Sequence, residues 1–539
     1  MSEKPVMLMP EDVQRLLGKD AQRNNIMAAK MVAEVVKTTL GPKGMDKMLV
    51  SPSGNIVVTN DGVTILDEMQ IEHPAAKMMV EISKTQDVEV GDGTTTVVMI
   101  AGKLLENAER LLDKKIHPTV ITKGYRLAAE KVQEILKEIS LRITPEDGDV
   151  LRHIAMTSMT GKGAEDSREK FAEIIVKAVK QIQEAGNVNL NDIKIEKSKG
   201  DSIQDTELIS GIVLDKERVS VDMPSKVHDA KIALVDFALE LKNPEIDTKV
   251  SISSPDQLQS FIDQEERTIK DMVEKVKMSG ANVVFCQKGI DDFAQYLLSK
   301  ENVYACRRVA KSNMEKLAKA TGGKIVSNLS ELSSSELGYA QTVEEVKHGE
   351  DSLTYIRGCQ NPKAVTILIH GGTDHVIDEI ERAIKDGLGV VASSLKTGLV
   401  VPGGGAIEVE LARRLRHFGQ SLSGREQLAV EEFASALEFI PTTLAENAGM
   451  DPIDVLTEMK SKHDSGDMNA GLNLFTNKIE NVLEARIIEP YKIKSQAVTS
   501  ASEVAIMILR IDDVVASADK GGAPGMPGMG GMPPGMGGY

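Results

Sequence analysis

The hydrophobic pattern of the chain changes twice along its length, and this change constrains the fold more than any other feature. From about residue 20 to residue 145, apolar residues recur at helical spacing, most clearly between Val97 and Leu112. Between about residues 231 and 372, short apolar runs such as AVTILIH at 364–370 alternate with amphipathic segments such as 290–300 and 311–320, which indicates an α/β layer. Helical spacing returns after residue 403. A chain of 539 residues with this order is predicted to have several domains, with an α/β block between two helical stretches.

The composition limits both the core and the partners. The chain has 9 Phe, 7 Tyr and no Trp, so Leu, Ile, Val and 25 Met must fill the interior, which favours helix-rich packing. The net charge is −17 and no basic patch is evident, so we expect no nucleic-acid partner.

The cysteines and the apolar runs indicate the cellular compartment in which we expect the protein. Cys286, Cys306 and Cys359 lack the spacing of a metal site and fit buried thiols in a reducing compartment. No window approaches the ~18 apolar residues of a membrane helix, and we expect a cytoplasmic protein with no membrane partner. Residues 521–539 are rich in Gly, Pro and Met and are predicted to be a flexible tail, either an inert end or a segment that contacts apolar partners.

The segment Gly91-Asp92-Gly93-Thr94-Thr95-Thr96 is the strongest candidate for chemistry, because it precedes the best-patterned helix. Helix N-termini bind phosphate through free amides and the helix dipole, and Mg²⁺ usually takes one carboxylate plus phosphate oxygens. Asp and Thr are also good helix caps, so capping alone is an equal alternative. The chain lacks the GxxxxGK[ST] pattern of a Walker A loop.

Other segments have a functional and a purely structural interpretation. Leu40-Gly41-Pro42 either approaches an anion or only ends a helix, and Asn60-Asp61-Gly62 is by default a turn. A helix is predicted from Asp374 to about Ser394, and Asp386 points away from its apolar stripe, which by pattern alone predicts a solvated carboxylate. Gly403-Gly404-Gly405 is a joint or an exposed backbone surface.

A helix that starts at the capping box Ser254-Pro255-Asp256-Gln257 has an apolar face interrupted at residues 263–268. This interruption leaves open whether the helix packs in the core or partly projects from the body.

Taken together, the motifs are similar to those of group II chaperonin subunits of the archaeal thermosome type, over essentially the whole chain. The segments that carry the resemblance include TTLGPKGMDKMLV at 38–50, VVTNDGVTILDEM at 57–69, GDGTTTVV at 91–98, AMTSMTGKGAE at 155–165, SGREQLAVEEFASALEFIP at 423–441, TLAENAGMDPID at 443–454 and LRIDDVV at 509–515. They occur in the order of that family.

The resemblance implies a subunit with three domains: a mainly α equatorial domain, a small α/β intermediate domain and an α/β apical domain with a helical lid protrusion. The expected boundaries are 1–146 and 404–520 for the equatorial domain, 147–215 and 370–403 for the intermediate domain, 216–369 for the apical domain and about 242–276 for the lid. A separate argument agrees: if loops near 92 and 404 share one nucleotide, the α/β block between them must be an insertion whose ends return together.

The resemblance also implies a site for ATP and Mg²⁺. It implies Asp92 as the metal ligand and Asp61 and Asp386 as the groups that orient and activate the hydrolytic water. It places Thr160 and Lys162 near the γ-phosphate. The other residues implied to bind the nucleotide are Leu40, Gly41, Pro42, Gly93, Thr94, Thr95, Thr96, Gly404, Gly471, Glu489 and Lys494.

The implied function is an ATP hydrolase that encloses non-native polypeptides in a chamber and promotes their folding. The implied partners are those polypeptides and like or homologous subunits in stacked rings, with eightfold symmetry. Two alternative functions remain: an ATP-dependent enzyme that acts on a small molecule, and a passive holdase that binds unfolded chains without nucleotide turnover.

Overall fold

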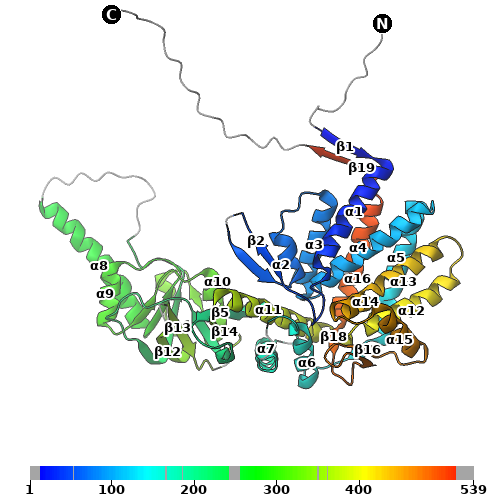
Figure 1. The fold of residues 1–539 in the computed structure, drawn as a ribbon. Coiled ribbons are helices and arrows are strands. Elements are labelled where there is room, and N and C mark those ends of the chain that lie inside the picture. The colour runs from blue at the N-terminus through cyan, green and yellow to red at the C-terminus, as the bar shows by residue number, and fades with distance from the viewer. Residues whose placement is uncertain are drawn as a thin grey trace, which may run out of the picture.

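The structure is a computed structural model that describes residues 13–52, 54–163, 167–184, 186–241, 255–348, 351–360 and 362–517. Its elements form three bodies in a row, which we call the helical, middle and sheet bodies (Figure 1). The long helix α11 (Asp374–Thr397) runs between the sheet body and the helical body (Figure 1). The predicted tail at 521–539 lies outside the described residues.

The helical body is built from both ends of the chain around a large apolar core, and a smaller apolar cluster beside it holds α15. Its helices are α1 (Gly18–Lys37), α2 (Gly62–Glu68), α3 (Pro74–Val90), α4 (Thr94–Asp113), α5 (Pro118–Ile139), α12 (Ala406–Ser421), α13 (Glu426–Leu437), α14 (Phe439–Asn447), α15 (Pro452–Asp464) and α16 (Tyr491–Leu509). Helix α4 lies at the centre and packs against α1, α3, α13 and α16. The helix predicted at 97–112 is thereby confirmed, and its early residues are buried as well, because other helices cover it on several sides.

The few aromatic rings of the helical body include one pair in its core. Tyr125 and Phe433 meet edge to face with ring centroids 5.6 Å apart. The Tyr125 hydroxyl donates a hydrogen bond of 2.7 Å to the Leu104 carbonyl, which satisfies the buried polar tip.

The middle body joins the other two and combines a small sheet with three helices. In its sheet, β14 (Val365–Gly371) pairs in parallel with β5 (Ile193–Lys199) and antiparallel with β6 (Glu207–Ile209). Its helices are α6 (Gly148–Met159), α7 (Arg168–Ile182) and α11. Every residue of β14 is buried, in keeping with the continuous apolar run that predicts this strand.

The sheet body contains a mixed sheet with the strand order β10-β9-β8-β12-β13-β7, to which β11 adds beside β8. The strands are β7 (Gly211–Leu214), β8 (Lys226–Val235), β9 (Val283–Cys286), β10 (Tyr304–Cys306), β11 (Ile325–Val326), β12 (Gly338–His348) and β13 (Asp351–Arg357). Helices α9 (Asp292–Lys300) and α10 (Lys311–Thr321) confirm two predicted amphipathic segments. The three cysteines are buried and form no disulfide bond.

Helix α8 (Pro255–Ser279) extends from the sheet body (Figure 1), and its two halves differ. Phe261 and Ile262 in the first half are exposed, whereas Ile269, Val273 and Val276 are buried in the core of the sheet body. The expected lid boundary at 276 therefore includes core residues, because the apolar stripe resumes after the interruption at 263–268. Ser254 and the rest of 242–254 lie outside the described residues.

The described residues also form four small sheets. They are β1 (Val13–Leu17) with β19 (Asp513–Ser517), β2 (Lys47–Val50) with β3 (Ile56–Thr59), β16 (Ala470–Asn473) with β17 (Lys478–Asn481), and β4 (Leu141–Arg142) with β15 (Leu399–Pro402) and β18 (Ile488–Pro490). Within the described ranges, no helix has the length and apolar character needed to span a bilayer.

Candidate functional site

A cavity of about 210 Å³ lies where the helical and middle bodies meet. All but two of the predicted site residues contribute to its wall: Leu40, Gly41, Pro42, Asp61, Asp92, Gly93, Thr94, Thr95, Thr96, Thr160, Lys162, Gly404, Glu489 and Lys494. These residues come from segments more than 400 positions apart in the chain. The fold therefore brings together the loops that the sequence singled out separately.

One wall of the cavity is the N-terminus of α4. Gly93 is the N-cap residue, with a φ of 82°, and no side chain caps the first amides of the helix. A Cβ atom at Gly93 would lie 2.8 Å from Ile493 Cγ2, so a side chain would collide there. The Gln86 amide nitrogen donates to the carbonyls of Asp92 (2.9 Å) and Ile493 (3.3 Å) and fixes the turn. The arrangement leaves backbone N–H groups and the positive end of a helix dipole available to an anion.

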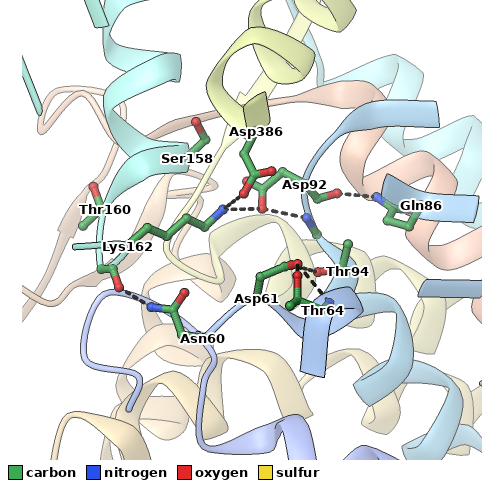
Figure 2. A network of polar contacts seen from close by, with 12 residues as sticks. Asn60, Asp61, Thr64, Gln86, Asp92, Thr94, Ser158, Thr160, Lys162 and Asp386 are labelled. Atoms are coloured by element: carbon green, nitrogen blue, oxygen red, sulfur yellow. Dashed lines mark hydrogen bonds and ion pairs between the residues drawn. The ribbon is translucent and has the colours of Figure 1, made fainter. Parts of the chain in front are cut away.

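A network of carboxylates with one lysine lies beside this helix end (Figure 2). Lys162 Nζ lies 2.6 Å from Asp386 Oδ2 and 3.2 Å from Asp92 Oδ1. Lys162 follows α6, Asp386 lies on α11 and Asp92 lies between α3 and α4, so three elements converge on one ammonium group.

Asp61 is held from the opposite side by the first turns of two helices. It is the N-cap residue of α2, where its Oδ2 accepts hydrogen bonds from Thr64 N (3.1 Å) and Thr64 Oγ1 (2.7 Å). Its Oδ1 accepts from Thr94 Oγ1 at 2.9 Å. The Asn-Asp-Gly segment is therefore not a hairpin turn between two strands, because β3 leads directly into a helix whose first amides need a cap.

Asp386 does not line the cavity directly, and it is not solvated as the pattern of α11 alone predicted. It is 9% exposed, because the segment that carries Lys162 covers the polar face of α11. An amphipathic pattern identifies the apolar face of a helix, but it does not reveal that a second body will cover the polar face.

Burial and mutual repulsion control the ionisation of this network. Burial raises the pKa of Asp386 well above its ordinary value; the nearby Asp61 and Asp92 carboxylates raise it further, and Lys162 opposes them. Burial alone would lower the pKa of Lys162, but the carboxylates of Asp386 and Asp92 outweigh it and raise that pKa. Lys162 is therefore charged, and Asp386 is a stronger base than an exposed aspartate.

Two residues of a second buried ion-pair cluster, Glu489 and Lys494, also line the cavity. Lys494 Nζ lies 2.6 Å from Glu489 Oε2 and 2.8 Å from Glu408 Oε1. Burial raises the pKa of Glu489 and Glu408 adds to the shift, while Lys494 opposes it. Glu408 lies on α12, which starts at the predicted glycine joint, and it was not predicted because its side chain is buried behind Lys494.

The remaining predicted residues differ in what they contribute. Gly471 does not line the cavity; a Cβ atom there would lie 2.7 Å from Val482 Cγ1 and 3.0 Å from the Gly403 carbonyl, so it permits close packing behind the cavity. Thr160 lines the cavity, but its hydroxyl already donates to the Met156 carbonyl at 2.7 Å and accepts from Arg168 Nη1 at 2.9 Å.

Sequence reasoning missed the apolar part of the wall, which consists of Ile440, Leu444, Leu472, Leu474, Phe475, Ile487, Ile488 and Ile493 among others. It also missed Asn447, whose side-chain amide donates to the carbonyls of Lys37 (3.1 Å) and Leu40 (2.9 Å) and so shapes the Leu40-Gly41-Pro42 loop. Apolar wall residues resemble core residues in a sequence, and no local signal separates them.

The donor set fits Mg²⁺ bound together with a polyphosphate. Within the described parts of the chain, no cluster of three or more His, Cys, Asp or Glu side chains is arranged to hold a metal by itself. Mg²⁺ commonly binds through one or two carboxylates plus substrate phosphates. Asp92, beside free helix amides and Lys162, offers that combination.

Comparison with known proteins identifies the class to which this fold and site belong. The model of the TCP-1/cpn60 chaperonin family matches residues 32–519, so the chain belongs to this family. Within the family it is similar to the thermosome subunit of Methanopyrus kandleri, with 56% identity over 520 residues that cover 96% of this chain and 95% of the relative.

The beta and alpha thermosome subunits of Archaeoglobus fulgidus are similar to the same extent. The beta subunit is 57% identical to this chain, over 98% of this chain and 98% of the subunit. The alpha subunit is 54% identical, over 95% of this chain and 95% of the subunit. The chain is therefore a group II chaperonin of the archaeal type, as the motifs predicted, and a member of a multi-domain α/β family that assists protein folding.

Proposed function

We propose that the cavity binds Mg-ATP and that its hydrolysis drives the closure of a folding chamber around non-native polypeptides. The observation that carries this proposal is the bridge from Lys162 to both Asp92 and Asp386. Membership in the chaperonin family supports the use of a nucleotide, and the alpha and beta names of the relatives support an assembly of homologous subunits in rings.

In this proposal each residue of the network has a distinct task. Asp92 holds Mg²⁺, and the α4 amides with Thr94, Thr95 and Thr96 bind the phosphates. Asp61 and Asp386 orient the attacking water, and the raised pKa of Asp386 suits it to accept a proton. The metal, when bound, neutralises phosphate charge, and Lys162 adds a positive charge near the γ-phosphate. Gly404, Glu489 and Lys494 face the ribose and base.

The coupling of hydrolysis to closure follows from the origin of these residues. Lys162 and Asp386 belong to the middle body, whereas Asp61 and Asp92 belong to the helical body. A swing of the middle body away from the helical body would leave metal and phosphates bound but the water unactivated. Hydrolysis therefore requires closure.

The sheet body is the proposed binding surface for client polypeptides, and the first half of α8 belongs to the proposed lid. Phe261 and Ile262 give this half of the helix an exposed apolar surface. An apolar surface of this kind fits contact with an unfolded chain or with neighbouring lids. Closure isolates a client and prevents aggregation through exposed apolar segments.

The variant Asp386→Ala tests the mechanism, with Asp378→Asn on the exposed face of the same helix as its matched control. We expect the variant to lose about 100-fold or more in ATP turnover, because the water loses its general base. Client refolding should fall with it. If refolding by the variant is undiminished, the closure mechanism is wrong and a passive holdase is favoured.

The variant Asp92→Ala tests the metal assignment. Without this carboxylate, magnesium-dependent phosphate release should fall to background at any Mg²⁺ concentration. Chelation of the metal should reduce phosphate release by the wild type to the same background. If Asp92→Ala hydrolyses ATP at the wild-type rate, the assignment of Asp92 as the metal ligand is wrong. Turnover that appears only after one small substrate is added would instead favour a metabolic enzyme.

The lid proposal can be tested without disturbing the core. Replacing residues 243–266 by a short Gly-Ser linker retains Ile269, Val273 and Val276. We expect an encapsulated client to lose its protection from protease in the presence of ATP while ATP turnover persists. Full protection would exclude this segment as the lid.

A further inference from the structure

We infer that the strand end formed by Val58, Thr59 and Asn60 is a latch that positions Lys162 and Asp386 for hydrolysis. The inference rests on the proposed function and deepens it, because it assigns a task to Asn60 and Arg382, which have none in the chemistry above. In this role both are positioning residues that act through other side chains.

The first contact of the latch joins Asn60 to the loop that carries Lys162. Asn60 Nδ2 donates a hydrogen bond to the Gly161 carbonyl (Figure 2). Asn60 is only 7% exposed, so water competes weakly for this bond. Since Gly161 directly precedes Lys162, the bond fixes the backbone from which the ammonium group reaches Asp92 and Asp386.

The backbone around Gly161 leaves little room for another position. A Cβ atom at Gly161 would lie 3.0 Å from Pro42 Cα and 3.2 Å from the Gly41 carbonyl oxygen. The Lys162 loop thus lies between the Leu40-Gly41-Pro42 loop and Asn60. Losing the Asn60 bond frees this loop on one side only.

The second contact joins the same strand end to α11. Arg382 Nη2 donates to the Val58 carbonyl at 3.2 Å. The guanidinium group is itself oriented by Glu379 Oε2, which lies 3.1 Å from Arg382 Nε and 2.6 Å from Nη2. Arg382 is one helical turn before Asp386, so this contact sets the position of α11 where it presents the carboxylate.

The strand end can act as a fixed reference because it is anchored in the helical body. Thr59 Oγ1 accepts a hydrogen bond from the Asp61 amide at 3.1 Å, and Asp61 caps α2 and bonds to Thr94. Three consecutive residues therefore connect both moving groups to the helix end proposed to bind phosphate. When the middle body swings away, both latch bonds must break.

A double-mutant cycle tests the latch against a merely structural role. The proteins are wild type, Asn60→Ala, Lys162→Ala and the double variant, with Asn55→Ala on the exposed tip of the same hairpin as the control. We expect Asn60→Ala to lower kcat about tenfold with less than a twofold change in ATP affinity, and to have no further effect in the Lys162→Ala background. Asn55→Ala should keep wild-type turnover.

The outcomes separate this inference from the proposed function. Equal fold-losses from Asn60→Ala in both backgrounds, or unchanged kcat, would overturn the latch alone. Wild-type turnover by Lys162→Ala would overturn the role of Lys162 and the latch with it. If Asn60→Ala fails to assemble, a second double-mutant cycle with Arg382→Gln and Asp386→Asn tests the other contact. If the losses in kcat from these two substitutions are additive, the inference is overturned.

Discussion

At the scale of single residues, Glu410 shows how a buried charge is made tolerable in this protein. Its carboxylate is 1% exposed, accepts hydrogen bonds from Arg413 Nη2 (2.8 Å) and Arg414 Nε (2.7 Å), and lies 3.1 Å from His463 Nδ1. Burial alone would raise its pKa, but these partners outweigh burial and lower the pKa from 4.5 to about 2. The charged form is therefore favoured in the folded state.

The lowered pKa predicts how stability depends on pH. A carboxyl group with a lower pKa in the folded state stabilises above its unfolded pKa and loses this effect as the pH falls toward the folded value. Between neutral pH and about pH 3.5, Glu410 should lose about 1.4 kcal/mol of its contribution.

The comparison with Glu410→Gln isolates this effect from other carboxylates. The variant should be less stable at pH 7 by roughly 3 kcal/mol, because it removes the carboxylate that the half-buried Arg413 and Arg414 share. The difference between the thermal unfolding midpoints of the two proteins should narrow as the pH is lowered. A constant difference from pH 7 to about pH 3.5 would contradict the assigned partners.

At the scale of elements, the approach of α11 to the Gly91 turn positions Asp386. A Cβ atom at Gly389 would lie 2.9 Å from the Val90 carbonyl oxygen and 3.0 Å from Gly91 Cα. Both neighbours are backbone atoms, which cannot rotate away. Gly389 thus permits a helix of the middle body to touch the loop that holds Asp92.

The variant Gly389→Ala measures the importance of this approach. Alanine adds ~1 kcal/mol of helix propensity, but overpacking against backbone typically costs 1–3 kcal/mol, so about ten-fold slower ATP turnover and reduced stability are expected. Gly372→Ala is the control, because nothing lies within 4 Å of its Cβ position. Turnover at the wild-type rate in Gly389→Ala would show that the contact does not control the site.

Elements with a strong period could be predicted from the sequence, whereas contacts between elements could not. The apolar stripes predicted α4 and α11 within a few residues. The pairing of Gly389 with Gly91 has no local signal, because it depends on where two helices cross. The contact between Asp386 and Lys162 also has no local signal, so the helical pattern predicted a solvent-exposed Asp386. Only the resemblance to chaperonins indicated a role for Asp386 in the site.

At the scale of the whole molecule, one core unites the two ends of the chain. The apolar core of the helical body contains residues from Ile26 to Leu136 and from Val401 to Leu509. The two changes in hydrophobic pattern predicted an α/β block between two helical stretches, and the fold explains them because the chain leaves the helical body after α5 and returns at α12. The exact domain boundaries, including those at 146 and 404, stay predictions.

The central claim is that three segments of the chain complete one magnesium nucleotide site only when the middle body is closed. The most direct test is a structure of the assembled protein with Mg²⁺, ADP and a fluoride mimic of the γ-phosphate. We predict the Asp92 carboxylate at about 2.1 Å from Mg²⁺, with Lys162 and Asp386 in hydrogen-bonding reach of the mimic or its attacking water. A closed subunit whose nucleotide is not in contact with Asp92, or lies beyond the reach of Asp386, would contradict the account.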